Sequence, residues 1–357
     1  MRNPAQNNKL RVAVFMGGWS HERSISLQSG ATMFHHLVGQ RYTVRAVELL
    51  PDRRARVLSP DIPPEPEALQ KERPLPLLDA LHTLLHWPVD VAMLALHGVG
   101  GEDGVIQGAL ELLNIPHSHS TVAGAAISMD KIISKRLFTA YAIPTPPFFV
   151  ITNSNDALAQ HQSSGFGWPV VMKSPCLGSS FEVHIVRAPE AFLRTANHLL
   201  ELDRRVLVER YIEGREFTCA VLQRHYGAPP EALPVTEIVP VHSEFFDFDA
   251  KYTPGATREI TPAPIPAELA QRIQHLAVQC HQALQCESVS RTDIMMDRQG
   301  ALFALETNMI PGMTKLSLLP QAAKHAGISY RRLLQMMVEY AHARATTNRA
   351  PASHSLH

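Results

Sequence analysis

The sequence predicts an α/β protein in its N-terminal part and an α+β arrangement in its C-terminal parts. Before Pro147, apolar strands alternate with glycine turns and helices, which is the order of an open α/β layer. After Pro147, short strands alternate with short helices, and near the end two strands face each other across the polar turn Asp297–Gly300. A chain of 357 residues provides two or three domains at about 100–200 residues each.

The elements expected before Pro147 are apolar strands and helices delimited by glycine and proline. They are the strands Arg11–Phe15, Thr43–Leu49 and Val89–Gly98 and the helices Ser20–Leu37, Leu77–Leu85, Gly104–Ile115 and Met129–Ala142. The short apolar strands are typical of a buried parallel sheet. Residues 51–76 hold prolines and charges without periodicity, and we expect a loop there.

The elements expected after Pro147 are shorter and more strongly patterned. They are the strands Pro147–Ile151, Trp168–Lys173, Glu182–Val186, Arg205–Glu213, Glu216–Leu222, Thr236–Val241, Ser288–Asp297 and Ala301–Asn308 and the helices Pro189–Leu202, Pro266–Cys286 and Tyr330–His342. In the helix from Pro266, apolar residues recur at helical spacing, so one face should be buried.

Composition argues against several classes of partner. Lys plus Arg equals Asp plus Glu at 33 each, so we expect neither nucleic acid nor a membrane surface as a partner. The four cysteines form no CxxC pair, which in a chain of this size favours a reducing, cytoplasmic compartment. The N-terminal apolar run is too short for a signal peptide, and no run reaches the ~20 residues of a membrane span.

The strand pair near the end of the chain carries the most informative polar residues. Alternate strand residues share a face, so Arg291 lies beside Asp293, and Glu306 beside Asn308. Folding the pair at Asp297–Gly300 places Arg291 opposite Glu306, with Asp293 diagonal to it. Two carboxylates and a carboxamide are oxygen ligands suited to Mg²⁺ held jointly with phosphate. The alternative is a solvated strand face with a surface salt bridge.

Three further segments have weaker patterns. An amide near Gly312 could stabilise an oxyanion, and Ser317 could bind a carboxylate, although an ordinary turn explains both. Glu209 and Glu216 could contact a nucleotide, although a polar hairpin with scattered charge explains them equally well. His97 ends a parallel-type strand, where ligands of open α/β sheets bind. No Gly-x-Gly-x-x-Gly stands in the frame of a dinucleotide fold.

The stretch VMKSPCLGSSFEVHIV, Val171–Val186, raises the question of nucleotide binding directly. It predicts a strand, a loop of small residues and a second strand. Gly178, Ser179 and Ser180 could cradle a phosphate, with Lys173 just upstream.

The ordered set of motifs resembles the D-alanine–D-alanine ligase family of ATP-grasp enzymes over about residues 10–342. The segments that carry the resemblance are Val12–Gly30, Leu96–Pro116, Ser128–Phe138, Val208–Thr218, Phe245–Gly255, Ser290–Met296 and Leu305–Tyr330. The GGWS opening, HSHS after Pro116 and the TPAPIP stretch are similar to the alphaproteobacterial branch.

The resemblance implies a three-domain ATP-grasp architecture. The expected regions are a disordered start at 1–9, an N-terminal α/β domain at 10–127, a central subdomain at 128–215, a C-terminal domain at 216–345 and a disordered tail at 346–357. The implied reaction joins two D-alanines through an acyl phosphate, for peptidoglycan precursors, with ATP and two Mg²⁺ or Mn²⁺ ions. A cytoplasmic homodimer is also implied.

The resemblance assigns roles to residues at matching positions. For ATP these are Lys131 and Lys173 on the phosphates, Gly178 and Ser180 in the loop, Glu209, Arg210, Tyr211 and Ile212 at the adenine, Glu216 at the ribose, and Lys251 in a mobile loop. For catalysis and substrate they are Glu22, His97 and Ser179 near the first D-alanine, Tyr252 in the mobile loop, Arg291 and Gly312 as oxyanion donors, and Ser317 and Leu318 at the second D-alanine. The metal ligands are Asp293, Glu306 and Asn308.

The phosphate loop departs from the family pattern. The family usually has Lys-Pro and then Glu-Gly-Ser-Ser-Val-Gly, whereas Leu177 and Phe181–Glu182 stand here in place of the Glu and of Val-Gly. Losing that glycine matters if its φ is positive, and Glu182 adds negative charge near the expected phosphates. A paralogue that ligates other amino or hydroxy acids, or a non-catalytic nucleotide-binding relative, therefore stays as an alternative.

Overall fold

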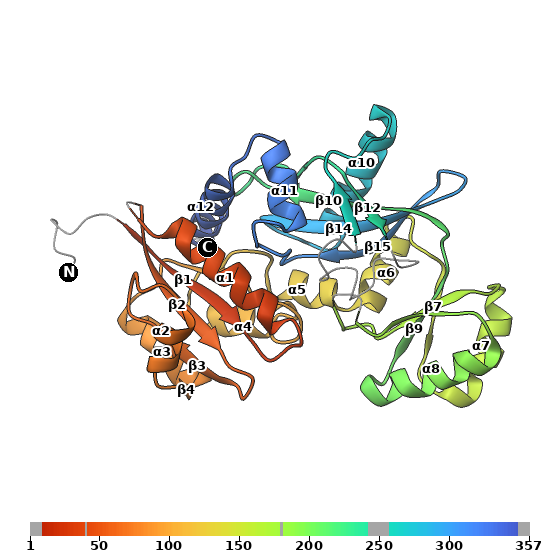
Figure 1. Ribbon diagram of the computed structural model, residues 1–357, viewed down its shortest axis with the longest axis horizontal. Helices are drawn as coiled ribbons and strands as arrows, with labels where there is room; N and C mark the ends of the chain where they lie inside the picture. The colour runs from red at the N-terminus through yellow and green to blue at the C-terminus, as the bar shows by residue number, and fades with distance from the viewer. Residues whose placement is uncertain (1–8, 40, 179–180, 242–256, 349–357) are drawn as a thin grey trace, which may run out of the picture.

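The computed structural model describes residues 9–39, 41–178, 181–241 and 257–348. The two ends predicted to be disordered lie almost wholly outside these ranges. The last helix, α12 (Tyr330–Asn348), continues past the predicted end at His342 and includes residues 346–348. Three β-sheets and the helices around them make up the described chain (Figure 1).

The first sheet lies in the N-terminal part and has the strand order β4-β3-β2-β1-β5. Its strands are β1 (Leu10–Gly17), β2 (Tyr42–Leu49), β3 (Arg54–Val57), β4 (Leu75–Pro76) and β5 (Val91–Leu94). Strand β1 pairs in parallel with β2 and β5, whereas β3 and β4 add an antiparallel edge. The expected open parallel layer is therefore present, and an antiparallel edge that the sequence did not indicate extends it.

The loop expected over 51–76 is wrong, because it contains β3, β4 and the helix α2 (Pro66–Lys71). These elements span only four, two and six residues. Segments this short leave no measurable periodicity. Pairing with β2 holds β3 in place, and only Ala55 of β3 is fully buried.

Helices cover both faces of the first sheet. Alternate residues of β1 enter two different cores, Val12 and Val14 on one face and Ala13 and Phe15 on the other, as expected for a strand buried on both sides. The first face packs on α1 (Arg23–Leu37) and on α12, which lie side by side in Figure 1. The second face packs on α3 (Leu77–His86) and α4 (Val105–Leu112).

The second sheet has six antiparallel strands in the order β13-β12-β10-β14-β15, with β11 paired to β10. They are β10 (Gly214–Leu222), β11 (Glu231–Ala232), β12 (Thr236–Pro240), β13 (Thr257–Ile260), β14 (Val289–Asp297) and β15 (Leu302–Asn308). Helix α10 (Ala267–Ala283) covers one face through Ile273, Leu276 and Cys280, which is the apolar stripe expected from the sequence.

The third sheet has four strands in the order β6-β9-β7-β8 and lies with α7 and α8 at the lower right of Figure 1. Its elements are β6 (Phe148–Ile151), a 3-10 turn (Ser154–Asp156), α7 (Ala157–Ser164), β7 (Val170–Lys173), β8 (Val183–Val186), α8 (Pro189–Leu202) and β9 (Val206–Arg210). Val170 and Met172 of β7 enter the core under α7 and α8, so Val171 and Lys173 face the other way.

The register between β14 and β15 differs from the predicted one. Arg291 pairs with Asn308 and Asp293 with Glu306, whereas nearer the turn Ile294 pairs with Ala304. The register shifts by one residue between Asp293 and Ile294, which leaves Leu305 as the extra residue of a bulge. The predicted pairing of Arg291 with Glu306 is therefore wrong, and the two carboxylates lie directly opposite each other.

Three helices connect the sheets: α5 (Val122–Met129), α6 (Lys131–Ala140) and α11 (Leu318–His325). The predicted boundary between 127 and 128 falls inside α5, and that between 215 and 216 falls inside β10.

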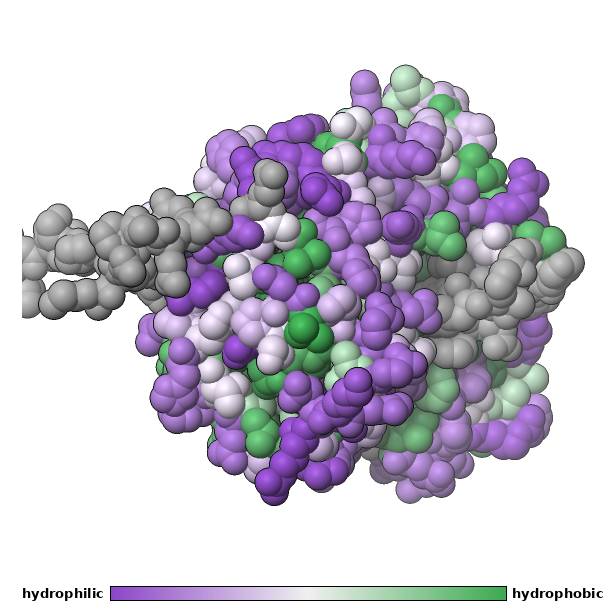
Figure 2. Space-filling view, turned by 60° about the vertical axis from the view of Figure 1, so that its left-hand side comes forward, coloured by the Kyte–Doolittle hydropathy of each residue, from purple (hydrophilic) through white to green (hydrophobic). Residues whose placement is uncertain are grey.

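Among the described residues, no helix has both the length and the apolar character needed to cross a bilayer. On the face shown in Figure 2, hydrophilic residues predominate and hydrophobic ones form small separate groups.

Candidate active site

A cavity of about 280 Å³ lies between the four-stranded and six-stranded sheets. Val171, Val183 and Ile185 form one apolar wall, and residues of β12, β14 and β15 form the other. Charged groups enter from Lys131, Lys173, Glu209, Asp293 and Glu306. A cavity with apolar walls and a few convergent charges suits a flat ring attached to an anionic group.

Glu209 lies deep in this cavity between two lysines. Its Oε2 is 2.7 Å from Lys173 Nζ, and Oε1 pairs with Lys135 Nζ, which also donates to Thr145 Oγ1 at 2.6 Å. Burial alone would raise the pKa of Glu209, but Lys135 and Lys173 lower it below its usual value. Burial also lowers the pKa of Lys135 to about 8, and Glu209 opposes this change. The Glu209 carboxylate is therefore engaged by lysines on both oxygens.

Lys135 was missed by the sequence reasoning, although the sequence does contain an indication of it. Lys131 and Lys135 are four residues apart on α6, so they share one face of the helix. Both are buried and both carry a carboxylate partner, Glu306 for Lys131 and Glu209 for Lys135. Helix α6 therefore supplies Lys131 to the cavity wall and Lys135 to the buried Glu209 carboxylate.

Lys131 joins the phosphate loop to the metal-ligand candidates. Its Nζ donates to the Leu177 carbonyl at 2.8 Å and lies 3.1 Å from Glu306 Oε2. Its backbone N–H donates to the Pro175 carbonyl at 3.0 Å. Burial opposes the charge of this lysine, but Glu306 raises its pKa above the usual value. Lys131 is therefore a fixed cation between the loop and β15.

Arg291, Asp293, Glu306 and Asn308 lie on one face of the β14–β15 pair. Arg291 donates from Nε and Nη2 to the two oxygens of Asp293, both at 3.0 Å, and Thr218 Oγ1 donates to Asp293 Oδ1 at 2.7 Å. Burial disfavours the charge of Arg291, yet Asp293 raises its pKa above the usual value. Two opposed carboxylates with a neighbouring carboxamide form an oxygen donor set that fits Mg²⁺.

A small cavity of about 20 Å³ continues from Lys131 and Glu306 toward the first sheet. Glu102, which the sequence reasoning did not assign, lines it and accepts a hydrogen bond from the Gly98 N–H at 2.7 Å. Burial, followed by the charge of Glu22, raises the pKa of Glu102 to about 8. Glu102 is therefore protonated at neutral pH in the folded protein.

The Glu22 carboxylate lies between two glycine segments. A Cβ on Gly98 would stand 3.1 Å from Glu22 Oε2, and one on Gly178 would stand 2.8 Å from the same atom. Gly98 also has a φ of +71°, so both the close approach and the backbone require glycine. Burial lowers the pKa of His97, which leaves a neutral imidazole near Glu22 and Arg291. The structure therefore brings together Glu22, His97 and the phosphate loop from three separate segments.

Gly312 and Ser317 lie together at the start of α11. A Cβ on Gly312 would stand 2.9 Å from Ser317 Oγ, which accepts a hydrogen bond from the Thr314 N–H at 3.0 Å. Leu318 is buried against Ile238 of β12. The free amides of a helix start and a neighbouring hydroxyl can bind a carboxylate.

The remaining predicted residues divide into two groups. Arg210, Tyr211, Ile212 and Glu216 line the large cavity from the end of β9 and the start of β10. Ser179, Ser180, Lys251 and Tyr252 lie outside the described residues.

Glu182, the departure that adds charge to the loop, does not line the large cavity. It has a φ of +55°, the left-handed conformation that glycine adopts without strain. Its carboxylate instead accepts hydrogen bonds from His184 at 2.8 Å and His198 at 2.9 Å. The extra charge is therefore paired outside the cavity.

Comparison with protein-family models identifies both halves of the chain. Residues 11–120 match the model described as D-ala D-ala ligase N-terminus, and residues 137–339 match D-ala D-ala ligase C-terminus. The chain belongs to the D-alanine–D-alanine ligase family. Among proteins of this family, it is 40% identical over 334 residues to the D-alanine--D-alanine ligase of Syntrophobacter fumaroxidans, covering 93% of this chain and 98% of that protein. It is 41% identical over 336 residues to that of Methylorubrum populi, covering 92% and 97%.

Solved structures of the family share the fold. The D-alanine--D-alanine ligase of Bacillus anthracis complexed with ATP superposes with a TM-score of 0.77 at 32% identity, covering 96% of this chain and 100% of that chain. The VanG D-Ala:D-Ser ligase of Enterococcus faecalis superposes with a TM-score of 0.77 at 27% identity, covering 93% of this chain and 99% of that chain. The fold is therefore the ATP-grasp fold that the sequence resemblance implied.

Proposed function

We propose that this member of the D-alanine–D-alanine ligase family joins two D-alanine molecules with ATP, and so supplies D-alanyl-D-alanine for peptidoglycan precursors. The observation that carries the proposal is the convergence of five charged groups, Lys131, Lys173, Arg291, Asp293 and Glu306, beside the Glu22 carboxylate. The five groups come from helix α6 and from three strands, β7, β14 and β15, which belong to two different sheets. Glu22 comes from the turn before α1.

In this proposal the large cavity holds ATP between its apolar walls. The adenine lies near Glu209, Arg210, Tyr211 and Ile212, where the end of β9 offers backbone groups, and Glu216 reaches the ribose. The phosphates extend toward Lys131 and Lys173. Glu209 contributes there by pairing with Lys173 and by opposing the effect of burial, which lowers the pKa of Lys135.

Asp293, Glu306 and Asn308 would hold two Mg²⁺ or Mn²⁺ ions against the phosphates. When bound, these ions neutralise the charge that develops as the γ-phosphoryl group transfers. Arg291 holds both oxygens of Asp293, and Lys131 holds the Oε2 atom of Glu306.

The chain's own residues act on two substrate molecules in turn. Glu22 binds the ammonium of the first D-alanine, near the neutral His97. The carboxylate of that D-alanine attacks the γ-phosphorus of ATP, ADP leaves, and an acyl phosphate forms. The amine of the second D-alanine then attacks the acyl carbon, and phosphate leaves. Arg291 and the Gly312 N–H donate to the tetrahedral oxyanion, a contribution commonly worth about 3–4 kcal/mol per donor. Ser317 and Leu318, at the start of α11, seat the second carboxylate.

The roles predicted for the phosphate loop and for the loop that holds Lys251 and Tyr252 complete the proposal. Gly178, Ser179 and Ser180 would bind phosphate through backbone amides, which tolerate side-chain changes in the loop. Lys251 and Tyr252 would close over the site and exclude water from the acyl phosphate. A cytoplasmic homodimer is part of the same proposal.

The test is phosphate release by the purified protein with ATP, Mg²⁺ and D-alanine, with L-alanine as the control and mass spectrometry of the product. D-alanine-dependent release with D-alanyl-D-alanine as the product is the expected result. Release only with D-serine or D-lactate as the second substrate would assign the chain to a ligase of different specificity. ATP binding without release for any pair would indicate a non-catalytic relative.

A further inference from the structure

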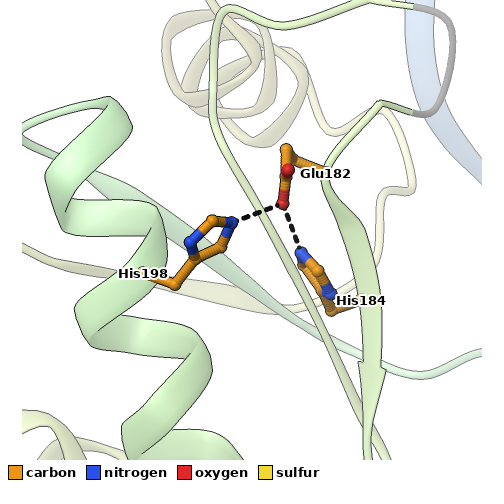
Figure 3. Close-up of side chains that lie close together, drawn as sticks. All are labelled: Glu182, His184 and His198. Atoms are coloured by element: carbon orange, nitrogen blue, oxygen red, sulfur yellow. Dashed lines mark hydrogen bonds and ion pairs between the residues drawn. The ribbon is translucent and has the colours of Figure 1, made fainter.

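Glu182, His184 and His198 form a Glu–His–His cluster at the outer edge of the four-stranded sheet (Figure 3). His184 lies on β8 and His198 lies on α8, and both Nε2 atoms point at the same oxygen, Glu182 Oε2, at 2.8 and 2.9 Å. One ligand atom from each residue lies within 4.8 Å of the other two. Three potential metal ligands from a loop end, a strand and a helix therefore converge on one point.

The ring orientations suit a shared ion. The imidazole planes are nearly perpendicular at 89°, in an edge-to-face arrangement with centroids 6.1 Å apart, so the two nitrogens approach from different directions. Tetrahedral Zn²⁺ with ligand bonds of about 2.0–2.2 Å places neighbouring ligand atoms roughly 3.4 Å apart. The two observed contacts, at 2.8 and 2.9 Å, are about 0.5 Å shorter than this spacing, and all three ligand atoms already lie within 4.8 Å of one another.

The backbone indicates that Glu182 is held in this position. Its φ of +55° is unfavourable for a side chain with a Cβ, and its Oε2 accepts both imidazole hydrogen bonds. Two imidazole nitrogens and one carboxylate oxygen are a recognised ligand set for divalent transition metals.

We propose that the Glu–His–His cluster binds one zinc-like divalent ion, with water in the remaining position. The exposed fractions of 37% for the His184 side chain and 48% for His198 leave an entry path and space for that water. Imidazole ligands favour Zn²⁺, Co²⁺ and Ni²⁺ over Mg²⁺, so the site differs in chemistry from Asp293, Glu306 and Asn308. An ion here joins β8 to α8 at the end of the phosphate loop.

Cobalt(II) is the probe, because its visible d–d absorption reports imidazole and tetrahedral coordination. Chelator-treated full-length protein is titrated with Co²⁺ in excess Mg²⁺, without ATP or D-alanine, and the bound ion is counted by equilibrium dialysis. We expect a visible band that saturates with binding and is displaced by Zn²⁺. Each of His198→Gln and His184→Gln should weaken this binding at least tenfold, as should Glu182→Gly.

The control is His86→Gln, which disrupts a separate histidine pair on α3, where His82 and His86 have ring centroids 4.9 Å apart. This variant should keep the band. Equal Co²⁺ affinity in wild type and His198→Gln, or loss of the band only in His86→Gln, would overturn the proposal. Because His198 is half-exposed on a helix, its variant should fold, and circular dichroism checks this. The assay requires no catalysis, so its result is independent of the ligase proposal.

Discussion

Two glutamates, one in the large cavity and one near it, each bind two basic partners, yet their surroundings differ. Glu209 is buried between Lys135 and Lys173, with only 3% of its side chain exposed, whereas Glu182 is partly exposed between His184 and His198. In the first group, every charge depends on the others because water cannot replace a missing partner. In the second group, water can replace a partner, so a proton or an ion can be exchanged. Burial, more than residue type, separates a fixed charge from an exchangeable one.

Asp293→Asn should have the largest effect on activity, because Asp293, like Glu209, is a buried carboxylate, and the substitution removes its charge where the metal ions would lie. Turnover should fall to background while the protein stays folded, since the amide oxygen still accepts hydrogen bonds from Thr218 and Arg291. The unfolding temperature should fall somewhat, because the buried Arg291 loses a carboxylate partner. Phosphate release and circular dichroism measure the two outcomes. Asp297→Asn, at the turn of the same strand pair, is the matched control and should stay active. Full activity of Asp293→Asn would contradict the metal assignment.

Glu209→Gln should be the most destabilising substitution, because it leaves Lys135 and Lys173 buried together without a carboxylate. Breaking such a buried group commonly costs about 3–5 kcal/mol. Urea denaturation measures the change in the free energy of unfolding. The control is Glu213→Gln, which disrupts the exposed pair with Arg298, and should cost at most about 1 kcal/mol. Similar losses in both variants would show that burial does not distinguish these groups.

Glu102→Gln tests a buried carboxyl that accepts a hydrogen bond from the Gly98 N–H and, within the part of the chain that the structure describes, forms no ion pair with a basic side chain. The pKa of Glu102 is raised from 4.5 to about 8 by burial and then by Glu22, so the folded protein keeps a proton that the unfolded chain releases. The stabilisation that this retained proton gives the folded state is complete below about pH 4.5 and is lost as the pH rises toward 8. The glutamine variant does not titrate.

As the pH rises between these values, the wild type should therefore lose unfolding free energy relative to Glu102→Gln, by on the order of a few kcal/mol. Denaturant unfolding from pH 4.5 to 8.5 gives the profile. A constant difference between the two proteins over that range would mean that Glu102 titrates normally.

Glu182→Gly should have the smallest effect on catalysis and stability. The substitution removes a left-handed non-glycine residue but adds backbone entropy to the unfolded chain, so the net change should stay within about 1 kcal/mol. The KM for ATP should be unchanged, because Glu182 does not line the cavity. Adding Leu177→Glu tests the loop itself, since Leu177 does line the cavity. A lower KM for Glu182→Gly alone would show that its charge reaches the phosphates.

The sequence by itself determined which residues share a strand face and which elements are long. Alternation placed Arg291 with Asp293 and Glu306 with Asn308, and the helix from Pro266 was recognisable from its apolar stripe. The motif resemblance led to the correct family and fold, and it pointed to Lys131 and Lys173, which reach one cavity. These features depend on local periodicity and residue type, which a single sequence contains.

Only the tertiary structure decided how those faces meet. The bulge at Leu305 shifted the register of β14 and β15, because pairing depends on both strands at once. Lys135 and Glu102 became site residues only when α6 and the turn after β5 were packed against the sheets. Glu182 and His198 are 16 residues apart, and they meet because α8 packs beside β8. Contacts between distant segments depend on packing, and packing determines which charges are buried and which stay open to water.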